Sequence, residues 1–180
     1  MAMFIHMTDE RTAHRILRAG IRQSRTATLD LNGTTIDRVV FCVPVVPNFQ
    51  ATFQWTRELK RGGHRVARAV QFRIDDHEMV LVGHFGRQHD PMTASQAVAV
   101  FLRADDPWGL QVLVPRAISP REIIRLRSVP QVTGWRFYPS AKGRPPLWPP
   151  PGAINASRLR WAVENRANAP WALPHHRRKG

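Results

Sequence analysis

Proline is unevenly distributed along this 180-residue chain, and its distribution limits where a packed domain can form. Eight of the 15 prolines lie in residues 139–180, and three of them are consecutive, at Pro149-Pro150-Pro151. Proline lacks the backbone N–H that helix interiors and central strands require, so we expect this segment to be extended. The sequence therefore predicts a folded domain over residues 1–139 and a C-terminal arm over residues 140–180, in which residues 155–166 could form a short helix.

Strand and helix patterns follow one another in mixed order through the first 139 residues. Runs of β-prone or alternating apolar residues predict strands at residues 3–6, 38–44, 67–74, 79–85, 110–115 and 134–139. Helical spacing predicts helices over residues 9–19, between Asn48 and Gly62, and from Thr93 to about residue 103. Residues 22–37 are polar, with a turn signal at Asn32-Gly33. This mixed order favours an α+β fold over a doubly wound parallel sheet.

Two helix starts carry specific signals. Thr8 is the residue type that caps a helix N-terminus, and the two acids after it would lie in the first turn, where the helix dipole favours negative charge. Ser119 and Glu122 have capping-box spacing around a proline at the first helical position. We therefore expect a second capped helix, a short one, to carry Ile123 and Ile124.

The chain is strongly basic, and most of the excess charge lies near its C-terminus. Lys and Arg number 27 against 13 Asp and Glu, for a net charge of +14, and 24 of the 27 are Arg. Residues 121–180 contain 12 of the basic residues but only two acids, Glu122 and Glu164. A polyanionic partner such as nucleic acid is the usual cause of such a charge. A genome-wide bias toward Arg is the alternative.

Several classes of protein are excluded by composition. The single cysteine, Cys42, rules out a disulfide framework or a Cys-rich zinc site within the chain. No apolar run approaches the roughly 20 residues that a membrane-spanning helix needs. The first ten residues lack the basic flank and apolar stretch of a secretory signal, so a reducing cytoplasm is the expected location.

Basic and aromatic residues are interleaved after residue 134. Cations can follow phosphates while aromatic rings stack on unpaired bases, so this pattern suits nucleic acid. The other interpretation is a proline-rich strap whose tryptophans pack back on the domain. The candidate nucleic-acid-binding residues are Arg136, Lys142, Arg144, Trp148, Arg158, Arg160 and Trp161.

Residues 83–90 contain two histidines and an aspartate, all of which can bind metals. Their spacing matches no zinc motif, and no fourth ligand is evident, so we predict no metal site. A solvated loop is the expected state of His84, His89 and Asp90. Since Gly83 and Gly86 permit close approach, a substrate-recognition loop is the alternative.

Three segments together resemble one enzyme superfamily. FIHMTDERTAHRILRAGI resembles the opening strand–His–x–Thr–helix of the ADP-ribosyltransferase fold, and RVVFCVP resembles its second core segment. QVLVPRAISPREII resembles the late strand of the DNA-modifying members, which typically reads Glu-x-Leu-Val-Pro. The resemblance covers about residues 3–124 and implies a split sheet, mixed or antiparallel, with short flanking helices. It also implies that NAD is bound as a substrate and that ADP-ribose is transferred to nucleic acid.

The resemblance assigns roles to particular residues. His6 matches the His that holds a ribose hydroxyl of NAD, and Thr8 lies close to it. Phe41 stands where the superfamily has Tyr, and Gln111 stands where the transferases have a catalytic Glu. An amide can bind a hydroxyl, but it cannot accept a proton or stabilise a ribose cation as a carboxylate does. Trp55, on the second helix, could cover a nicotinamide or adenine ring, or it could simply be a core aromatic.

Because Phe41 and Gln111 differ from the residues of the superfamily, three interpretations of the function remain open. The protein could be an NAD-dependent transferase acting on nucleic acid. It could be a catalytically altered relative, or one like the RNA 2′-phosphotransferases of the same fold, that serves as a nucleic-acid-binding module. It could also be a basic α+β protein of unrelated fold. The first two readings require His6, Phe41 and Gln111 to line one cleft, with His6 and Gln111 on adjacent or nearly adjacent strands.

Overall fold

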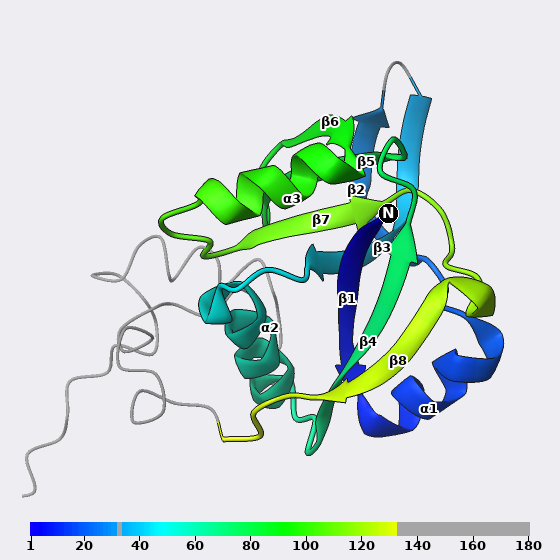
Figure 1. Ribbon diagram of the computed structural model, residues 1–180, viewed down its shortest axis with the longest axis vertical. Coiled ribbons are helices and arrows are strands. Elements are labelled where there is room, and N and C mark those ends of the chain that lie inside the picture. The colour runs from blue at the N-terminus through cyan, green and yellow to red at the C-terminus, as the bar shows by residue number, and fades with distance from the viewer. Residues whose placement is uncertain (32–33, 133–180) are drawn as a thin grey trace, which may run out of the picture.

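A computed structural model describes residues 1–31 and 34–132 of the chain. These residues form an α+β fold in which three helices pack on an eight-stranded antiparallel sheet (Figure 1). The strands are β1 (Ala2–Asp9), β2 (Ser24–Leu31), β3 (Thr34–Pro44), β4 (Ala67–Ile74), β5 (Met79–His84), β6 (His89–Thr93), β7 (Leu110–Val114) and β8 (Ile123–Ser128). The helices are α1 (Glu10–Ala19), α2 (Phe49–Arg61) and α3 (Ala94–Arg103), with a single 3₁₀ turn at Pro120–Glu122.

The sheet is divided into two parts that meet at β1 and β3. Its strand order is β6-β5-β7-β3-β1-β4-β8, and β2 pairs with β3 beside this path. β1 pairs with β4 along its whole length, but its pairing with β3 is recorded only at Phe4 with Pro44 and Ile5 with Val43. Beyond Ile5 the two strands separate, and β3 continues by pairing with β7. Figure 1 shows β5, β6 and β7 running across the direction of β1, β4 and β8.

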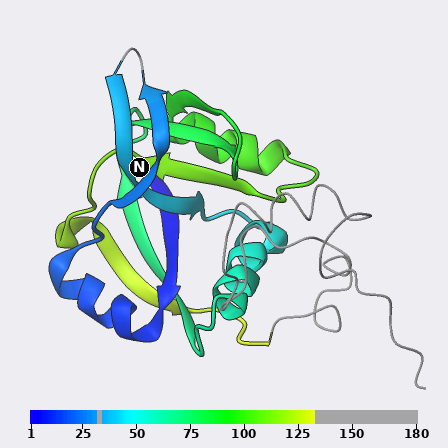
Figure 2. The same ribbon diagram turned by 180° about the vertical axis from the view of Figure 1, so that it is seen from behind.

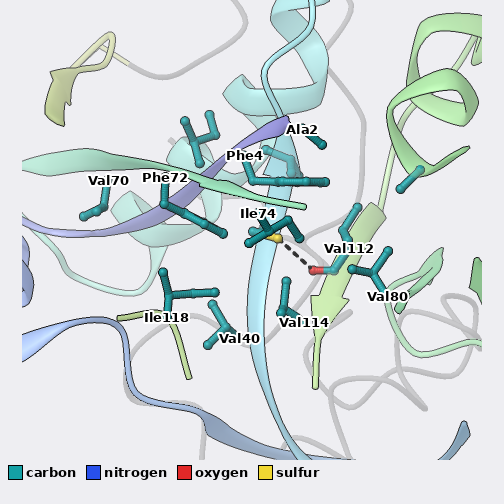
Figure 3. Packing of buried hydrophobic residues seen from close by; sticks show 14 of the residues in the cluster. Ala2, Phe4, Val40, Val70, Phe72, Ile74, Val80, Val112, Val114 and Ile118 are labelled. Carbon is teal, nitrogen blue, oxygen red and sulfur yellow. Dashed lines mark hydrogen bonds between the residues drawn. The ribbon is translucent and has the colours of Figure 1, made fainter. Parts of the chain in front are cut away.

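One main hydrophobic core joins the two parts of the sheet. Phe4 and Phe72, on neighbouring strands, are fully buried and stacked with their ring centroids 6.0 Å apart. Figure 3 shows these rings beside the buried β7 residues Val112 and Val114. Burying a large apolar side chain contributes about 1.5–3 kcal/mol, so this cluster strongly favours the observed strand register.

Most of the predicted elements are confirmed, several of them with the predicted boundary residue. β4 spans the predicted residues 67–74. Asn48 caps α2, and Thr93 caps α3 in a capping box with Gln96. The predicted strand at residues 134–139 and the arm at residues 140–180 lie outside the described residues.

Two of the predicted helix signals were misread. Thr8 does not cap α1, because it is still part of β1; Asp9 caps the helix by accepting a hydrogen bond of 3.0 Å from the Thr12 N–H. The capping box at Ser119 is present, but it starts only the 3₁₀ turn. Ile123 and Ile124 belong to β8, where pairing with β4 and the β preference of branched side chains outweigh the local helix start.

Besides β8, two strands were not predicted. β2 lies in segment 22–37, which was interpreted as polar although Ala27, Leu29 and Leu31 alternate with polar residues as in a half-buried strand. β6 begins at His89, inside the expected solvated loop, and contains Pro91. Proline is tolerated there because β6 is an edge strand and needs hydrogen bonds on one side only.

Candidate functional site

A cavity of about 270 Å³ opens beside the point where β1 and β3 separate. Its lining comes from five separate parts of the chain: β1, β3, α2, β7 and the residue that follows β5. Most of the lining is apolar, and no charged side chain of residues 1–31 or 34–132 contributes to it. The lining residues are Ile5, His6, Met7, Phe41, Cys42, Val43, Trp55, Leu59, Phe85 and Gln111.

The cavity therefore brings together four residues that the sequence singled out. His6 lies on β1 and Gln111 on β7, and these strands are separated in the sheet by β3, which carries Phe41. Trp55 comes from α2 and forms another part of the wall. Thr8 is buried on β1 but is not among the lining residues.

A single hydrogen bond determines which proton His6 carries. Its Nδ1 lies 2.8 Å from the backbone oxygen of Phe41, and a carbonyl oxygen only accepts, so the ring proton is on Nδ1. Burial lowers the pKa of His6, and the Phe41 carbonyl opposes that shift only in part, so the ring is neutral at pH 7. His6 Nε2 is therefore a hydrogen-bond acceptor, and no partner for it is recorded in the described part of the chain.

The same contact gives Phe41 a role that the sequence did not predict. Its carbonyl orients His6 where β1 and β3 have parted and regular strand pairing has ended. The Phe41 ring packs against a small second cluster formed by Val39, Leu81 and Leu113. Phe41 thus orients His6 through its backbone, while its side chain packs against this second cluster.

Gln111 is held by a histidine that reaches across an intervening strand. Gln111 on β7 pairs with Gly83 on β5, and Gly83 in turn pairs with His89 on β6, so the three residues form one row across the sheet. The amide nitrogen of Gln111 lies 3.1 Å from Nε2 of His89 and donates to it. Because Gly83 has no side chain, the His89 ring can cross this row and reach the amide.

His89 is therefore buried behind the cavity wall. The prediction that it belongs to a solvated loop was wrong. It is 8% exposed, and its Nδ1 makes no hydrogen bond of normal geometry within the described residues. Burial lowers the pKa of His89, while the backbone of Arg87 and the charge of Asp90 oppose the shift. The ring is neutral at pH 7, which leaves Nε2 free to accept from Gln111. In the sequence around His89, Gly83 was the one residue that indicated this arrangement, since a glycine permits another side chain to approach its backbone closely.

Gln54, which was not predicted to have a role, holds α2 in place beside the cavity. Its fully buried amide donates to the Pro107 carbonyl at 2.7 Å and accepts from the Gly109 N–H at 2.6 Å. These bonds hold α2 against the loop that leads into β7. Trp55, the next residue of α2, meets Phe85 edge to face with ring centroids 6.3 Å apart. The two rings form an aromatic wall beside Gln111.

The described residues of the cavity include no activated nucleophile and no metal ligand set. The Cys42 thiol donates to the Val112 carbonyl at 3.5 Å, and burial raises its pKa well above the usual range, so it stays protonated. No group of three or more His, Cys, Asp or Glu side chains capable of holding a metal ion occurs in residues 1–31 and 34–132. No helix among those residues is long and apolar enough to cross a membrane.

Replacing Gly83 with alanine tests whether His89 depends on the missing side chain. A Cβ at this position would lie 2.5 Å from the Gln88 backbone oxygen and 2.9 Å from Cγ of His89, both shorter than normal contacts. We expect Gly83→Ala to lower the free energy of unfolding by about 1–3 kcal/mol, as overpacking does. The displaced His89 ring should gain solvent, and its NMR-measured pKa should rise toward 6.5.

Gly86→Ala in the same hairpin is the matched control. A Cβ at Gly86 meets no atom within 4 Å, although the positive φ of 76° strains any other residue. This variant should therefore leave the pKa of His89 unchanged even if it costs stability. An unchanged His89 pKa in Gly83→Ala would contradict the prediction that the position of the His89 ring depends on the missing side chain at Gly83.

No family model, curated protein or solved structure matches this chain. The function is therefore inferred from the cavity and from the side chains that line it.

Proposed function

We propose that this protein has an ADP-ribosyltransferase-like fold, binds NAD in the cavity between β1 and β3, and acts on nucleic acid. One observation carries the proposal: His6, Phe41, Trp55 and Gln111 come from four different elements and line the same cavity. The sequence resemblance named three of these residues for an NAD site. An accidental resemblance gives no reason for them to meet around a single cavity.

The polar groups of the cavity suit the sugar of a nucleotide. Nε2 of the neutral His6 can accept a hydrogen bond from a ribose hydroxyl, which is the role that the resemblance implies for it. The side chain of Gln111, held by His89, supplies a second polar group. Trp55 and Phe85 supply aromatic surface for a flat ring such as nicotinamide.

The size and charge of the cavity limit which part of NAD it takes. Pockets that enclose whole drug-sized ligands usually have volumes of about 300–1,000 Å³, so a cavity of about 270 Å³ suits a fragment of the dinucleotide. Since none of the described lining residues is charged, none of them neutralises a diphosphate. We place the nicotinamide riboside half inside the cavity and the diphosphate outside it.

Transfer of ADP-ribose would break the bond between ribose C1′ and the nicotinamide nitrogen, and would join C1′ to an oxygen or nitrogen of the acceptor. The acceptor loses a proton, and nicotinamide leaves as a neutral ring. Positive charge develops on the ribose during this step, and a carboxylate would stabilise it. The lining of the cavity offers the neutral Gln111 instead.

The lack of a carboxylate among the described lining residues supports a second candidate function. Among the described residues that line the cavity there is no Asp or Glu. Binding of NAD needs only hydrogen bonds and apolar surface, whereas rapid transfer also needs charge stabilisation and a proton acceptor. A catalytically altered relative that binds nucleotide and nucleic acid without turnover fits this lining.

Calorimetric titration with NAD and with ADP-ribose tests the proposed binding. We expect binding to the full chain and a several-fold or greater loss of affinity in His6→Ala, because one net hydrogen bond contributes roughly 1 kcal/mol. His77→Ala removes an exposed histidine that is not part of the cavity and should bind as the wild type does. Thermal unfolding of each variant would identify a loss of folding.

Two results would contradict the proposal. One is the absence of both heat and thermal stabilisation at millimolar NAD and ADP-ribose in the folded wild-type protein. The other is an affinity that is equal in His6→Ala and in the wild type.

A further inference from the structure

Helix α1 carries a row of exposed arginines on one face. Arg11, Arg15 and Arg18 are spaced by four and three residues, so they project from the same side of the helix. All three side chains are exposed, and no ion pair is recorded for any of them within the described residues. The two acids at the start of the helix are already engaged: Asp9 caps α1, and Glu10 pairs with Arg68 at 2.5 Å.

The opposite face of α1 is used by the core. Ala13 is fully buried and Ile16 is 6% exposed. The apolar face of this amphipathic helix therefore packs on the sheet and is not available for insertion into a lipid bilayer. Its charged face is the one presented to solvent.

A second cluster of unpaired positive charge follows directly along the chain. Arg25 on β2 and Arg38 on β3 are directly opposite each other in the antiparallel ladder, so their side chains share one face of the hairpin. Both are exposed, and no acidic partner is recorded for either in the described part of the chain. Like charges in this position are destabilising, and an anion bound between them would relieve the repulsion.

The elements that carry the two clusters lie on one side of the molecule. The chain passes from α1 through residues 20–23 directly into β2, and Figure 2 shows α1 and the β2–β3 hairpin along the side away from α2. Arg22, in this connection, is also exposed. We call Arg11, Arg15, Arg18, Arg22, Arg25 and Arg38 the α1 arginine surface.

We propose that the α1 arginine surface binds the phosphate backbone of nucleic acid. At 1.5 Å rise per residue, Arg11 to Arg18 covers about 10 Å, which is the axial length of about three phosphates on one strand of a duplex. All six cations are arginines, whose planar guanidinium binds phosphate oxygens in pairs. The inference rests on the proposed function for its ligand, and it locates an anchoring surface on the folded domain, distinct from the basic arm.

Fluorescence anisotropy with labelled 20-nucleotide single-stranded and duplex DNA tests this surface in the full-length protein. The test variant is Arg11→Gln/Arg15→Gln/Arg18→Gln. The control variant is Arg73→Gln/Arg87→Gln/Arg103→Gln, which removes the same charge from three other exposed positions. Each protein is titrated at several salt concentrations, and its NAD binding is measured separately.

We expect the test variant to bind about 10- to 100-fold more weakly than the wild type at 0.15 M salt. The slope of log affinity against log salt should fall by about 2 to 3, because each phosphate contact contributes roughly 0.7–0.9. The control should change both quantities much less. NAD binding should be the same in all three proteins, so a failure of the NAD proposal would appear as absent NAD binding and not as altered DNA binding.

Three outcomes would overturn the inference. The test variant could keep the wild-type affinity and salt slope. The control could lose as much as the test variant, which would reduce the effect to net charge. Vesicles with anionic headgroups could compete with DNA at equal phosphate concentration, with competition lost in the test variant, which would assign the surface to membranes.

Discussion

Replacing Gln111 with glutamate should raise the rate of NAD cleavage by about 100- to 10,000-fold, the range that a general acid or base typically contributes. The new carboxylate would line the cavity at the position where the resembling transferases have their catalytic Glu. It could stabilise the positive charge on ribose and accept the proton that the acceptor loses. Nicotinamide release from NAD, followed by chromatography, measures this rate directly.

The neighbouring histidine makes this substitution structurally plausible. Nε2 of His89 lies 3.1 Å from the Gln111 amide nitrogen, so a protonated His89 could donate to the new carboxylate. A nearby negative charge raises the pKa of a histidine and lowers the pKa of a carboxyl group. His89 therefore gives Glu at this position a way to remain ionised inside an apolar site.

Gln71→Glu is the matched control for a buried carboxylate. Gln71 is 3% exposed, lies on β4, is absent from the cavity lining, and accepts a hydrogen bond of 3.1 Å from Arg125. A glutamate there would have a cationic partner and should leave NAD cleavage unchanged. If Gln111→Glu folds, binds NAD and cleaves it no faster than the wild type, the cavity is not suited to this reaction, and the binding-module alternative gains support.

Neutralising the C-terminal arm should produce the second large effect, a loss of affinity for nucleic acid. The variant replaces four cations of the arm, and Arg136 just before it, with glutamine: Arg136, Lys142, Arg144, Arg158 and Arg160. If each contacts one phosphate, the salt slope for nucleic acid should fall by about 3.5 to 4.5. Affinity at 0.15 M salt should then drop on the order of 100- to 1,000-fold. Anisotropy titrations of single-stranded and duplex probes at several salt concentrations measure both quantities.

A control variant with the same change in charge distinguishes an effect of the arm on binding from an effect of the net charge. It neutralises five exposed arginines of the folded domain that lie outside the α1 arginine surface: Arg65, Arg73, Arg87, Arg103 and Arg121. If the arm variant keeps the wild-type affinity and slope, the arm is only a packing strap. An equal loss in both variants would mean that binding depends on total charge.

Local signals determined most of the regular structure. Thr93 caps α3 as predicted, because the cap bonds involve only residues three positions away, and α2 begins after Asn48, where the helical spacing starts. β4 has the predicted bounds, since its alternation reflects one half-buried face. Four of the five residues singled out for the NAD site, among them His6 and Gln111, meet in the cavity, whereas Thr8 does not line it.

The sequence by itself therefore determined the α+β class, the cap of α3 at Thr93, the strong positive charge and four residues that line one cavity. Only the tertiary structure decided that His89 is buried beside Gln111, since that contact depends on the registers of β5, β6 and β7 with one another. It also decided that Ile123 and Ile124 form an edge strand, because pairing with β4 outweighed a capping box. The physical reason is the same in both cases. Helix caps and alternation depend on neighbours in sequence, whereas strand partners come from distant segments and are selected by the packing of the whole sheet.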